Sequence, residues 1–253
     1  MSTHLSVIIP AFNEKKNLDK GLLDQVFEYL SKQDYQWEVI ISDDGSTDGS
    51  LIRLQQFARE HQQVKVLANK HGGKALAVTA GMLTAIGKWR LFTDFDQSTP
   101  ISEVEKLLER ATQGFDVIIG SREIVGARRD KEPWYRHFMG RGFNLLVQIV
   151  AVPGVLDTQC GFKLFSDKAT NALFPKLVVY GQKVVFKDAF TGSFDVELLY
   201  LAIKYNFSIR EVPIKWHHME TNRVSPLKDS IRMFRDLILI KLASLMGKYN
   251  EKL

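Results

Sequence analysis

The chain has 253 residues, 45% of them hydrophobic and 25% charged, a composition that excludes a disulfide-stapled miniprotein, a coiled coil and a disordered tail. Its single cysteine, Cys160, cannot form an internal disulfide and favours a reducing compartment. The net charge is +5, and the positive charge is concentrated in two segments, residues 122–141 with six Lys/Arg against three Asp/Glu and residues 223–253 with seven against three.

Short apolar runs alternate with longer amphipathic ones through the first 125 residues. Runs rich in β-branched and aromatic residues, bounded by turn residues, predict strands at residues 5–10, 37–42, 64–68, 89–94 and 117–121. Apolar residues at helical spacing predict helices over residues 18–30, from residue 51 and over 75–86, with Asn17 and Ser50 as N-caps. This alternation predicts an α/β fold, in which a mostly parallel sheet carries helices on both faces.

The second half of the chain is less regular. Its patterns predict a helix at 143–150, a strand at 161–165, a loop at 176–193, a helix at 194–205 and a strand at 208–214. A long amphipathic helix begins near Pro226, because proline suits the first turn of a helix. Since no linker rich in Gly, Ser or Pro interrupts the chain, we expect one domain over residues 1–225, followed by an amphipathic C-terminal helix at 226–253.

Acidic side chains follow three of the predicted strands. Glu14 ends the sequence PAFNE, Asp43 and Asp44 begin DDGSTD, and Asp94 and Asp96 form DFD. Ligands of open α/β sheets bind beyond the carboxyl ends of the strands, so we expect these groups to converge. Converging carboxylates need a cation, and Mg²⁺ commonly links one or two carboxylates to substrate phosphates. The pattern predicts a metal-held diphosphate, although each motif alone also fits a solvated turn or a helix cap.

A glycine turn, NKHGGK at residues 69–74, precedes the predicted helix at 75–86. Glycines at a helix entrance let backbone amides approach an anion, and the helix dipole favours negative charge there. The turn is neither a P-loop nor G-x-G-x-x-G, so the kinase and dehydrogenase interpretations lose their main support. An ordinary turn with a helix start is the structural alternative.

Together these motifs resemble the GT-A fold of family 2 glycosyltransferases. Three later motifs, GSR at 120–122, DTQCGFK at 157–163 and FDVE at 194–197, are similar to dolichyl- or polyprenyl-phosphate hexosyltransferases, most of all the dolichyl-phosphate β-glucosyltransferase branch. The resemblance covers residues 4–225 and implies a Rossmann-like GT-A domain. It also implies Mg²⁺- or Mn²⁺-dependent, inverting transfer of a hexose, glucose favoured, from a nucleotide-sugar, UDP-glucose favoured, to a polyprenyl or dolichyl phosphate. The alternative acceptor is a sugar hydroxyl in envelope polysaccharide synthesis.

The resemblance further implies roles for individual residues. Those expected to bind the nucleotide-sugar are Pro10, Phe12, Glu14, Asp43, Asp44, Lys74 and Asp94. Asp94 and Asp96 would be the metal ligands, with Asp96 the principal one. Arg122 would serve the donor diphosphate or the acceptor phosphate, and further candidates for the acceptor phosphate are Arg141, Lys163 and Arg223. The sequence departs from the pattern at the adjacent glycines before Lys74 and at Ser98, where mannosyl relatives often have Gln.

The acceptor decides whether a catalytic base is needed. A phosphomonoester, with a second pKa of ~6, is largely ionised near neutrality and needs positioning cations, whereas a hydroxyl needs a carboxylate base. Asp195 and Glu197 are the candidates, but on a helix they lie ~200° apart, so only one faces the site. We assign that role to Asp195, with a first-turn helix acid as the alternative. Lys163 is equally consistent with a solvent-facing lysine of a strand.

The two basic segments suggest how the protein meets a lipid substrate. In the C-terminal segment an apolar stripe is flanked by Lys228, Arg232, Arg235 and Lys241, and the stripe consists of Ile231, Phe234, Ile238, Leu242 and Leu245. No apolar run reaches the ~18 residues of a membrane span, whereas a basic amphipathic helix suits the bilayer interface. We expect peripheral attachment at the cytoplasmic face of the cell membrane. Packing on the domain or on a second copy in a homo-oligomer is the alternative, and nucleic-acid binding is not expected because its motifs are absent.

Overall fold

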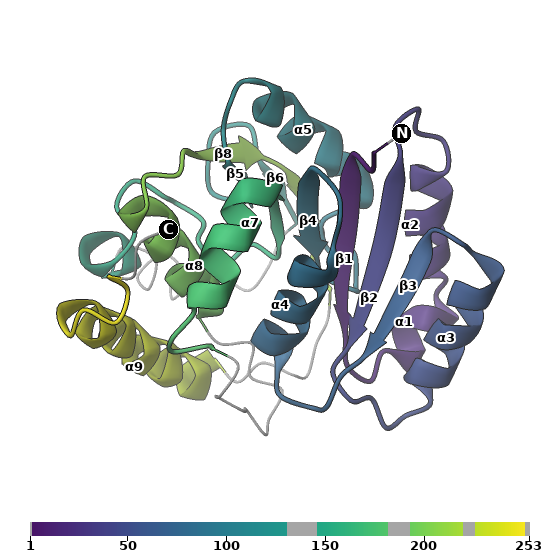
Figure 1. Ribbon diagram of the computed structural model, residues 1–253, viewed down its shortest axis with the longest axis horizontal. Coiled ribbons are helices and arrows are strands. Elements are labelled where there is room, and N and C mark those ends of the chain that lie inside the picture. Colours follow the sequence, from purple (N-terminus) through teal and green to yellow (C-terminus); the bar gives the residue numbers. More distant parts are fainter. Residues whose placement is uncertain (1, 131–145, 182–192, 220–225, 251–253) are drawn as a thin grey trace.

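A seven-stranded sheet forms the centre of the computed structural model, which describes residues 2–130, 146–181, 193–219 and 226–250 (Figure 1). The strands lie in the order β3-β2-β1-β4-β7-β5-β8. Their bounds are β1 Leu5–Ala11, β2 Trp37–Asp43, β3 Val64–Ala68, β4 Trp89–Thr93, β5 Val117–Ser121, β7 Phe162–Ser166 and β8 Ile209–Pro213. Only β7 runs antiparallel to its neighbours β4 and β5, and the other pairings in this sheet are parallel. The predicted α/β fold with a mostly parallel sheet is confirmed.

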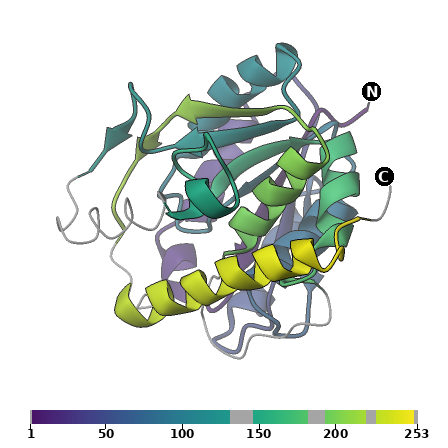
Figure 2. The same cartoon turned by 90° about the vertical axis from the view of Figure 1, so that its left-hand side faces the viewer.

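Helices cover both faces of the sheet. On one face lie α4 Lys74–Thr84, α7 Asp167–Leu173, α8 Phe194–Lys204 and α9 Pro226–Leu245, and on the other lie α2 Leu22–Leu30, α3 Ser50–Glu60 and α5 Val104–Thr112. Successive residues of a strand point to opposite faces, so Ile8 packs with the first group and Val7 with the second. Figure 1 shows α4 and α7 in front of the sheet, and the long yellow helix of Figure 2 is α9.

The remaining described elements are short. They are α1 Lys15–Asp19, the 3₁₀ helices Ile101–Glu103 and Phe174–Lys176, and a separate pair of two-residue strands, β6 Arg128–Arg129 and β9 Lys215–Trp216. Within the described residues no helix is both long and apolar enough to cross a membrane.

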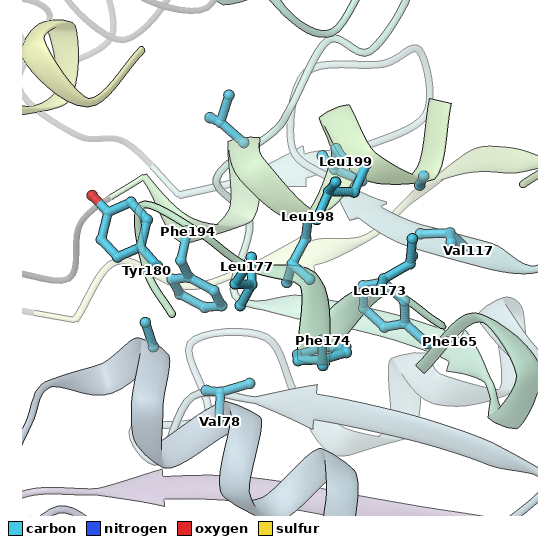
Figure 3. Packing of buried hydrophobic residues seen from close by; sticks show 14 of the residues in the cluster. Val78, Val117, Phe165, Leu173, Phe174, Leu177, Tyr180, Phe194, Leu198 and Leu199 are labelled. Atoms are coloured by element: carbon cyan, nitrogen blue, oxygen red, sulfur yellow. The ribbon is translucent and has the colours of Figure 1, made fainter. Parts of the chain in front are cut away.

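A dense core joins α4 to α8. Figure 3 shows Val78 of α4 facing Leu177, Phe194 and Leu198, with Tyr180 beside the ring of Phe194. All of these side chains are buried. Burying them stabilises the fold by about 1.5–3 kcal/mol each for the aliphatic and phenyl groups. This packing holds the first turn of α8 against the start of α4, and thereby fixes the distance between their polar residues.

The predicted strands of the first half match the observed ones to within one residue, but two helix starts were wrong. The predicted helix at 18–30 is two helices, α1 and α2, because Gly21 between them adopts the left-handed conformation with φ +68°. Asn17 therefore lies inside α1 and caps nothing. Ser50 is the first residue of α3, whose N-cap position is Gly49 at φ +90°, and Asp48 accepts hydrogen bonds from the Ser50 amide and hydroxyl.

In the second half, the strand at 161–165, the helix from Phe194, the strand at 208–214 and the helix from Pro226 were predicted within a residue or two. The helices α5 and α7 were not predicted. Residues 146–150 are helical, while the beginning of the helix predicted at 143–150, most of the loop predicted at 176–193, and Arg141 and Arg223 lie outside the described residues.

Candidate active site

The turns after β1 and β2 are tied together at the carboxyl edge of the sheet. Ala11 and Asp43 are partners in the parallel register, and the Asp44 amide donates to the Ala11 carbonyl at 2.8 Å. Asn13, in the left-handed region at φ +55°, donates through its amide to Ser46 Oγ at 2.9 Å and accepts from the Thr47 amide at 2.8 Å. The structure therefore brings together the predicted residues of these two turns.

Asp43 presents an unpaired oxygen in this edge. Its side chain is buried, and Oδ2 accepts hydrogen bonds of 3.0 Å from the Gly45 and Ser46 amides. Oδ1 is also buried but has no hydrogen-bond partner among the described residues. A buried carboxylate oxygen without a partner is costly. The geometry suits a ligand that brings an N–H donor to this position.

Asp44 has its hydrogen bonds inside the protein. Oδ1 accepts from the Gly72 amide at 2.8 Å, and Oδ2 accepts from the Gly73 amide at 3.0 Å and contacts His71 Nδ1 at 2.9 Å. The amides of the glycine turn are thus bonded to Asp44, which fixes the loop leading into α4. The His71 ring stacks on Phe12 with centroids 4.6 Å apart. Asp44 therefore shapes the loop around the predicted donor site.

Pro10 and Glu14 flank the same turn. Pro10 lies in β1 and is partly buried. Glu14 is buried at the start of α1, where its Oε2 accepts a 2.6 Å hydrogen bond from Asn17 Nδ2. The two residues thus lie on either side of the turn that Asn13 ties to the turn after β2.

Asp94 and Asp96 follow β4, and Lys74 of α4 lies beside them. Lys74 Nζ is 2.5 Å from Asp94 Oδ1, while Asp96 Oδ1 accepts from the Ser98 amide at 2.9 Å. Burial acts to lower the pKa of Lys74, but the negative charges of Asp94, Asp195 and Asp96 raise it above its usual range. Burial, reinforced by the charge of Asp94, raises the pKa of Asp96. The site is thus a cluster of close, opposite charges.

Lys163 and Asp195 form a second pair in this cluster. The Lys163 side chain is 0% exposed, and its Nζ lies 2.7 Å from Asp195 Oδ1 and 2.5 Å from the Cys160 carbonyl oxygen. Lys163 reaches this position because β7 is inserted between β4 and β5, where Lys163 pairs with Phe92. The alternative that Lys163 is a solvent-facing strand residue is wrong.

Glu197 does not face the charge cluster. Its carboxylate accepts hydrogen bonds from the amides of Val178, Val179 and Tyr180 at 2.6–2.9 Å, and from the Tyr249 hydroxyl at 2.7 Å. Burial raises the pKa of Glu197, and these donors act in the opposite direction. The helical separation of Asp195 and Glu197 is as predicted, and Glu197 anchors the chain before residue 182.

Arg122 is held by Asp157. Its Nε and Nη2 each donate a 2.8 Å hydrogen bond to the two carboxylate oxygens, and its backbone amide adds a third. The guanidinium carbon lies 5.5 Å from the centre of the Trp216 ring, a cation–π contact. Burial acts to raise the pKa of Asp157, but Arg122 lowers it below its usual range. Neither Asp157 nor Trp216 was assigned a role from the sequence, because no local pattern links residues so far apart in the chain.

The charge cluster fits a divalent cation that is shared with a diphosphate. Within the parts of the chain that the structure covers, no group of three or more His, Cys, Asp or Glu side chains is arranged to hold a metal ion. Mg²⁺ needs only one or two protein carboxylates when phosphates supply further oxygens, so Asp94 and Asp96 are the candidate ligands of such a cation. Cys160 is buried in the core, and burial raises the pKa of its thiol to about 12, which disfavours the nucleophilic thiolate.

Comparison with solved structures supports the fold. The glucosyl-3-phosphoglycerate synthase of Mycobacterium tuberculosis, crystallised with Mn²⁺, UDP and glucosyl-3-phosphoglycerate, superposes with a TM-score of 0.63 at 18% identity, over 99% of this chain and 81% of that one. TarS residues 1–349 of S. aureus, in complex with UDP-GlcNAc, gives a TM-score of 0.58 at 18% identity, over 96% and 67%. Both likenesses concern the GT-A fold.

Sequence comparison identifies the family. The dolichyl-phosphate β-glucosyltransferase of Saccharomyces cerevisiae is 35% identical over 98% of this chain and 77% of its own length, and the human enzyme of that name is 31% identical over 97% and 77%. The profile described as Glycosyl transferase family 2 matches residues 6–174. Because this profile covers most of the chain and the relatives are more than 30% identical along nearly its whole length, the chain belongs to glycosyltransferase family 2 and is a glycosyltransferase.

Proposed function

We propose that this glycosyltransferase moves a hexose, with glucose favoured, from a nucleotide-sugar, with UDP-glucose favoured, to a dolichyl or other polyprenyl phosphate. The observation that carries the proposal is the 31–35% identity with dolichyl-phosphate β-glucosyltransferases along nearly the whole chain. The carboxylates at the edge of the sheet, Asp43, Asp94 and Asp96, also suit the binding of a nucleotide-sugar with a divalent metal.

The donor site is supported by the residues at the ends of β1, β2 and β4. The unpaired Oδ1 of Asp43 fits the N–H of a nucleobase such as uracil, and Phe12 with its stacked partner His71 provides an apolar wall. Asp94 and Asp96 would hold Mg²⁺ or Mn²⁺, which supplies positive charge to stabilise the departing diphosphate. Lys74 would add its ammonium group to the same diphosphate.

The Lys163–Asp195 pair favours a phosphate acceptor over a hydroxyl. Asp195 Oδ1 already accepts a 2.7 Å hydrogen bond from the buried Lys163 ammonium, so this oxygen is engaged inside the protein rather than directed at an acceptor hydroxyl. A phosphomonoester with a second pKa of ~6 is already largely ionised and needs no strong base. Such an acceptor needs cations to position it opposite the leaving group, which gives inversion, and we assign this task to Arg122, Arg141, Lys163 and Arg223.

The acceptor assignments differ in their structural support. Arg122 has five N–H donors, of which its pairing with Asp157 uses Nε–H and one on Nη2, and its side chain is one-fifth exposed. Lys163 is 0% exposed and bonded to Asp195 and to the Cys160 carbonyl, so it would shape the acceptor site rather than contact the phosphate itself. Arg141 and Arg223 lie outside the described residues and remain proposals from the resemblance alone.

The apolar stripe of α9 supports docking at the membrane surface. One face of the helix is buried in the core through Leu237, Ile240 and Ala243. The opposite face is exposed through Ile231 (63%), Phe234 (47%), Ile238 (44%), Leu242 (48%) and Leu245 (75%). A helix that packs on the domain with one face and exposes apolar residues beside Arg235 and Lys241 on another suits an anionic bilayer surface. We therefore assign residues 226–253 to peripheral attachment at the cytoplasmic face.

Incubation with UDP-[¹⁴C]glucose, a polyprenyl phosphate and Mn²⁺ tests the function directly. The expected product is radioactive material that partitions into organic solvent and does not form in the presence of EDTA. Parallel reactions with GDP-sugars and with soluble sugar acceptors test the choice of donor and the hydroxyl alternative. Full activity of Asp96→Ala would contradict the metal assignment, and a water-soluble glycoside as the main product would contradict the lipid phosphate.

A further inference from the structure

Two lysines, Lys74 and Lys163, form ion pairs with carboxylates of the site, and the two pairs differ in their exposure to solvent. The Lys163–Asp195 pair is closed off, with side chains 0% and 9% exposed. The Lys74–Asp94 pair is more open, with side chains 21% and 33% exposed. Lys74 is also the first residue of α4 and extends from the end of the glycine turn. The partly exposed Lys74 ammonium can leave Asp94 for another anion, whereas the buried Lys163 ammonium cannot leave Asp195 in this way.

Lys74 occupies the position that a metal ion would need on Asp94. Its Nζ caps Oδ1 at 2.5 Å. The other oxygen is walled by Gly161, where an added Cβ would lie only 2.0 Å from Asp94 Oδ2. A cation that binds Asp94 through Oδ1 therefore meets the ammonium of Lys74, and the backbone at Gly161 narrows the approach to Oδ2.

We propose that Lys74 is a resident counter-ion of Asp94 that competes with the divalent metal and is released to the diphosphate when metal and nucleotide bind together. Metal alone must displace the ammonium without providing it with a new partner. Metal with a nucleoside diphosphate provides that partner, because the diphosphate offers the lysine another anion. The proposal rests on the proposed metal- and nucleotide-dependent function and adds an order of binding to it.

The charges of the site favour strong competition between the Lys74 ammonium and the divalent metal for Asp94. Lys74 interacts with Asp94, Asp96 and Asp195, and Lys163 pairs with Asp195, so these five side chains carry one net negative formal charge. Removing Lys74 would leave three carboxylates with one lysine, and a divalent cation would then be attracted more strongly. Reciprocal linkage requires that a nucleotide which draws Lys74 away also tightens metal binding, and that metal tightens nucleotide binding by the same factor.

Mn²⁺ binding measured by electron paramagnetic resonance, with no sugar transfer involved, tests the proposal. Wild type, Lys74→Met and Lys74→Gln are titrated with Mn²⁺ alone and with Mn²⁺ in saturating UDP. Lys70→Met is the matched control, because Lys70 is an exposed lysine of the same turn and has the same formal charge. Thermal unfolding of each variant verifies that it is folded.

We expect both Lys74 variants to bind Mn²⁺ alone about tenfold more tightly than wild type, since every 1.4 kcal/mol is a factor of ten. UDP should tighten Mn²⁺ binding in wild type and in Lys70→Met by a larger factor than in the Lys74 variants. Unchanged or weaker binding of Mn²⁺ alone by both folded Lys74 variants would overturn the role of Lys74. Absence of UDP-linked Mn²⁺ binding in wild type would instead overturn the proposed metal-dependent function, and the inference with it.

Discussion

Lys163 and Asp195 form an ion pair in which the lysine side chain is wholly inaccessible and its Nζ lies 2.7 Å from the carboxylate. The pair joins β7 to the first turn of α8. Taking two charges out of water is costly, and removing one partner leaves the other buried and unpaired. The site therefore depends on both residues for its shape as well as for its charge.

Replacing Lys163 by Met should lower the free energy of unfolding by about 3–5 kcal/mol, the typical effect of breaking a buried pair. Urea denaturation measures it. The double variant Lys163→Met/Asp195→Leu removes both charges and should recover part of this loss. The matched control is Lys168→Met, which removes an exposed lysine from α7 and should change stability by less than about 1 kcal/mol. Equal stability of wild type and Lys163→Met would contradict the buried ion pair.

Asp195→Asn separates the two acceptor classes. With a phosphate acceptor we expect kcat to fall only modestly, by about tenfold, because the ionised acceptor needs no strong base. With a hydroxyl acceptor the loss of a general base is typically 10²–10⁴-fold. Initial rates of lipid-linked glucose formation, compared between the folded variant and wild type at saturating acceptor, measure the effect. A loss in the upper range would favour the hydroxyl alternative.

The sequence predicted the strands of the first half well, because each is a compact apolar run closed by turn residues. It also located Asp43 and Asp94 at one edge, since parallel strands end there together, and it placed Lys74 at the entrance of the helix after the glycine turn. The sequence did not predict contacts between side chains that lie far apart in the chain. Nothing local to Asp157 indicates that it binds Arg122, or that Glu197 anchors the backbone at residues 178–180. Gly21 was missed as a helix boundary because helical periodicity continues across it, while its left-handed backbone interrupts the helix. Gly49 was missed as the N-cap of α3 because Ser50 is the residue type that usually caps a helix.

Asp43→Asn tests the unpaired carboxylate oxygen. The amide can still accept the hydrogen bonds of Gly45 and Ser46, but it places an NH₂ group where Oδ1 lies buried. We expect UDP affinity, measured by isothermal titration calorimetry with Mn²⁺, to fall by about tenfold or more, as for a lost hydrogen bond to a charged group. Asp116→Asn, at the opposite end of the sheet, is the control and should bind UDP as wild type does. Wild-type affinity of the Asp43 variant would exclude a contact between Asp43 and the nucleotide.

The Arg122–Asp157 pair should make stability sensitive to acid. Although burial acts against it, the Arg122 guanidinium holds the pKa of Asp157 below its ordinary value of about 3.9. The contribution of this group is therefore fully present above that ordinary value and is lost as the pH falls through the lower pKa of the folded state. The free energy of unfolding, measured by urea denaturation from about pH 6 to pH 2, should fall more steeply for wild type than for Asp157→Asn. Parallel curves for the two proteins would contradict the depressed pKa.

The exposed stripe of α9 predicts binding to anionic vesicles. Ile238→Glu and Leu242→Glu place charge on the outward face and leave the buried face of Leu237, Ile240 and Ala243 unchanged. Each replaced side chain loses about 1.5–3 kcal/mol of apolar burial, so co-sedimentation with phosphatidylglycerol vesicles should weaken at least about tenfold. Ile52→Glu is the matched control, because Ile52 is 70% exposed on α3, away from this face, and it should sediment like wild type. Loss of binding in all three variants would indicate general repulsion, and unchanged binding of both α9 variants would exclude the stripe as the docking surface.

Activity on a long-chain polyprenyl phosphate in vesicles should fall together with binding in the α9 variants, while UDP affinity stays at the wild-type level, because the stripe faces away from the core that positions α8.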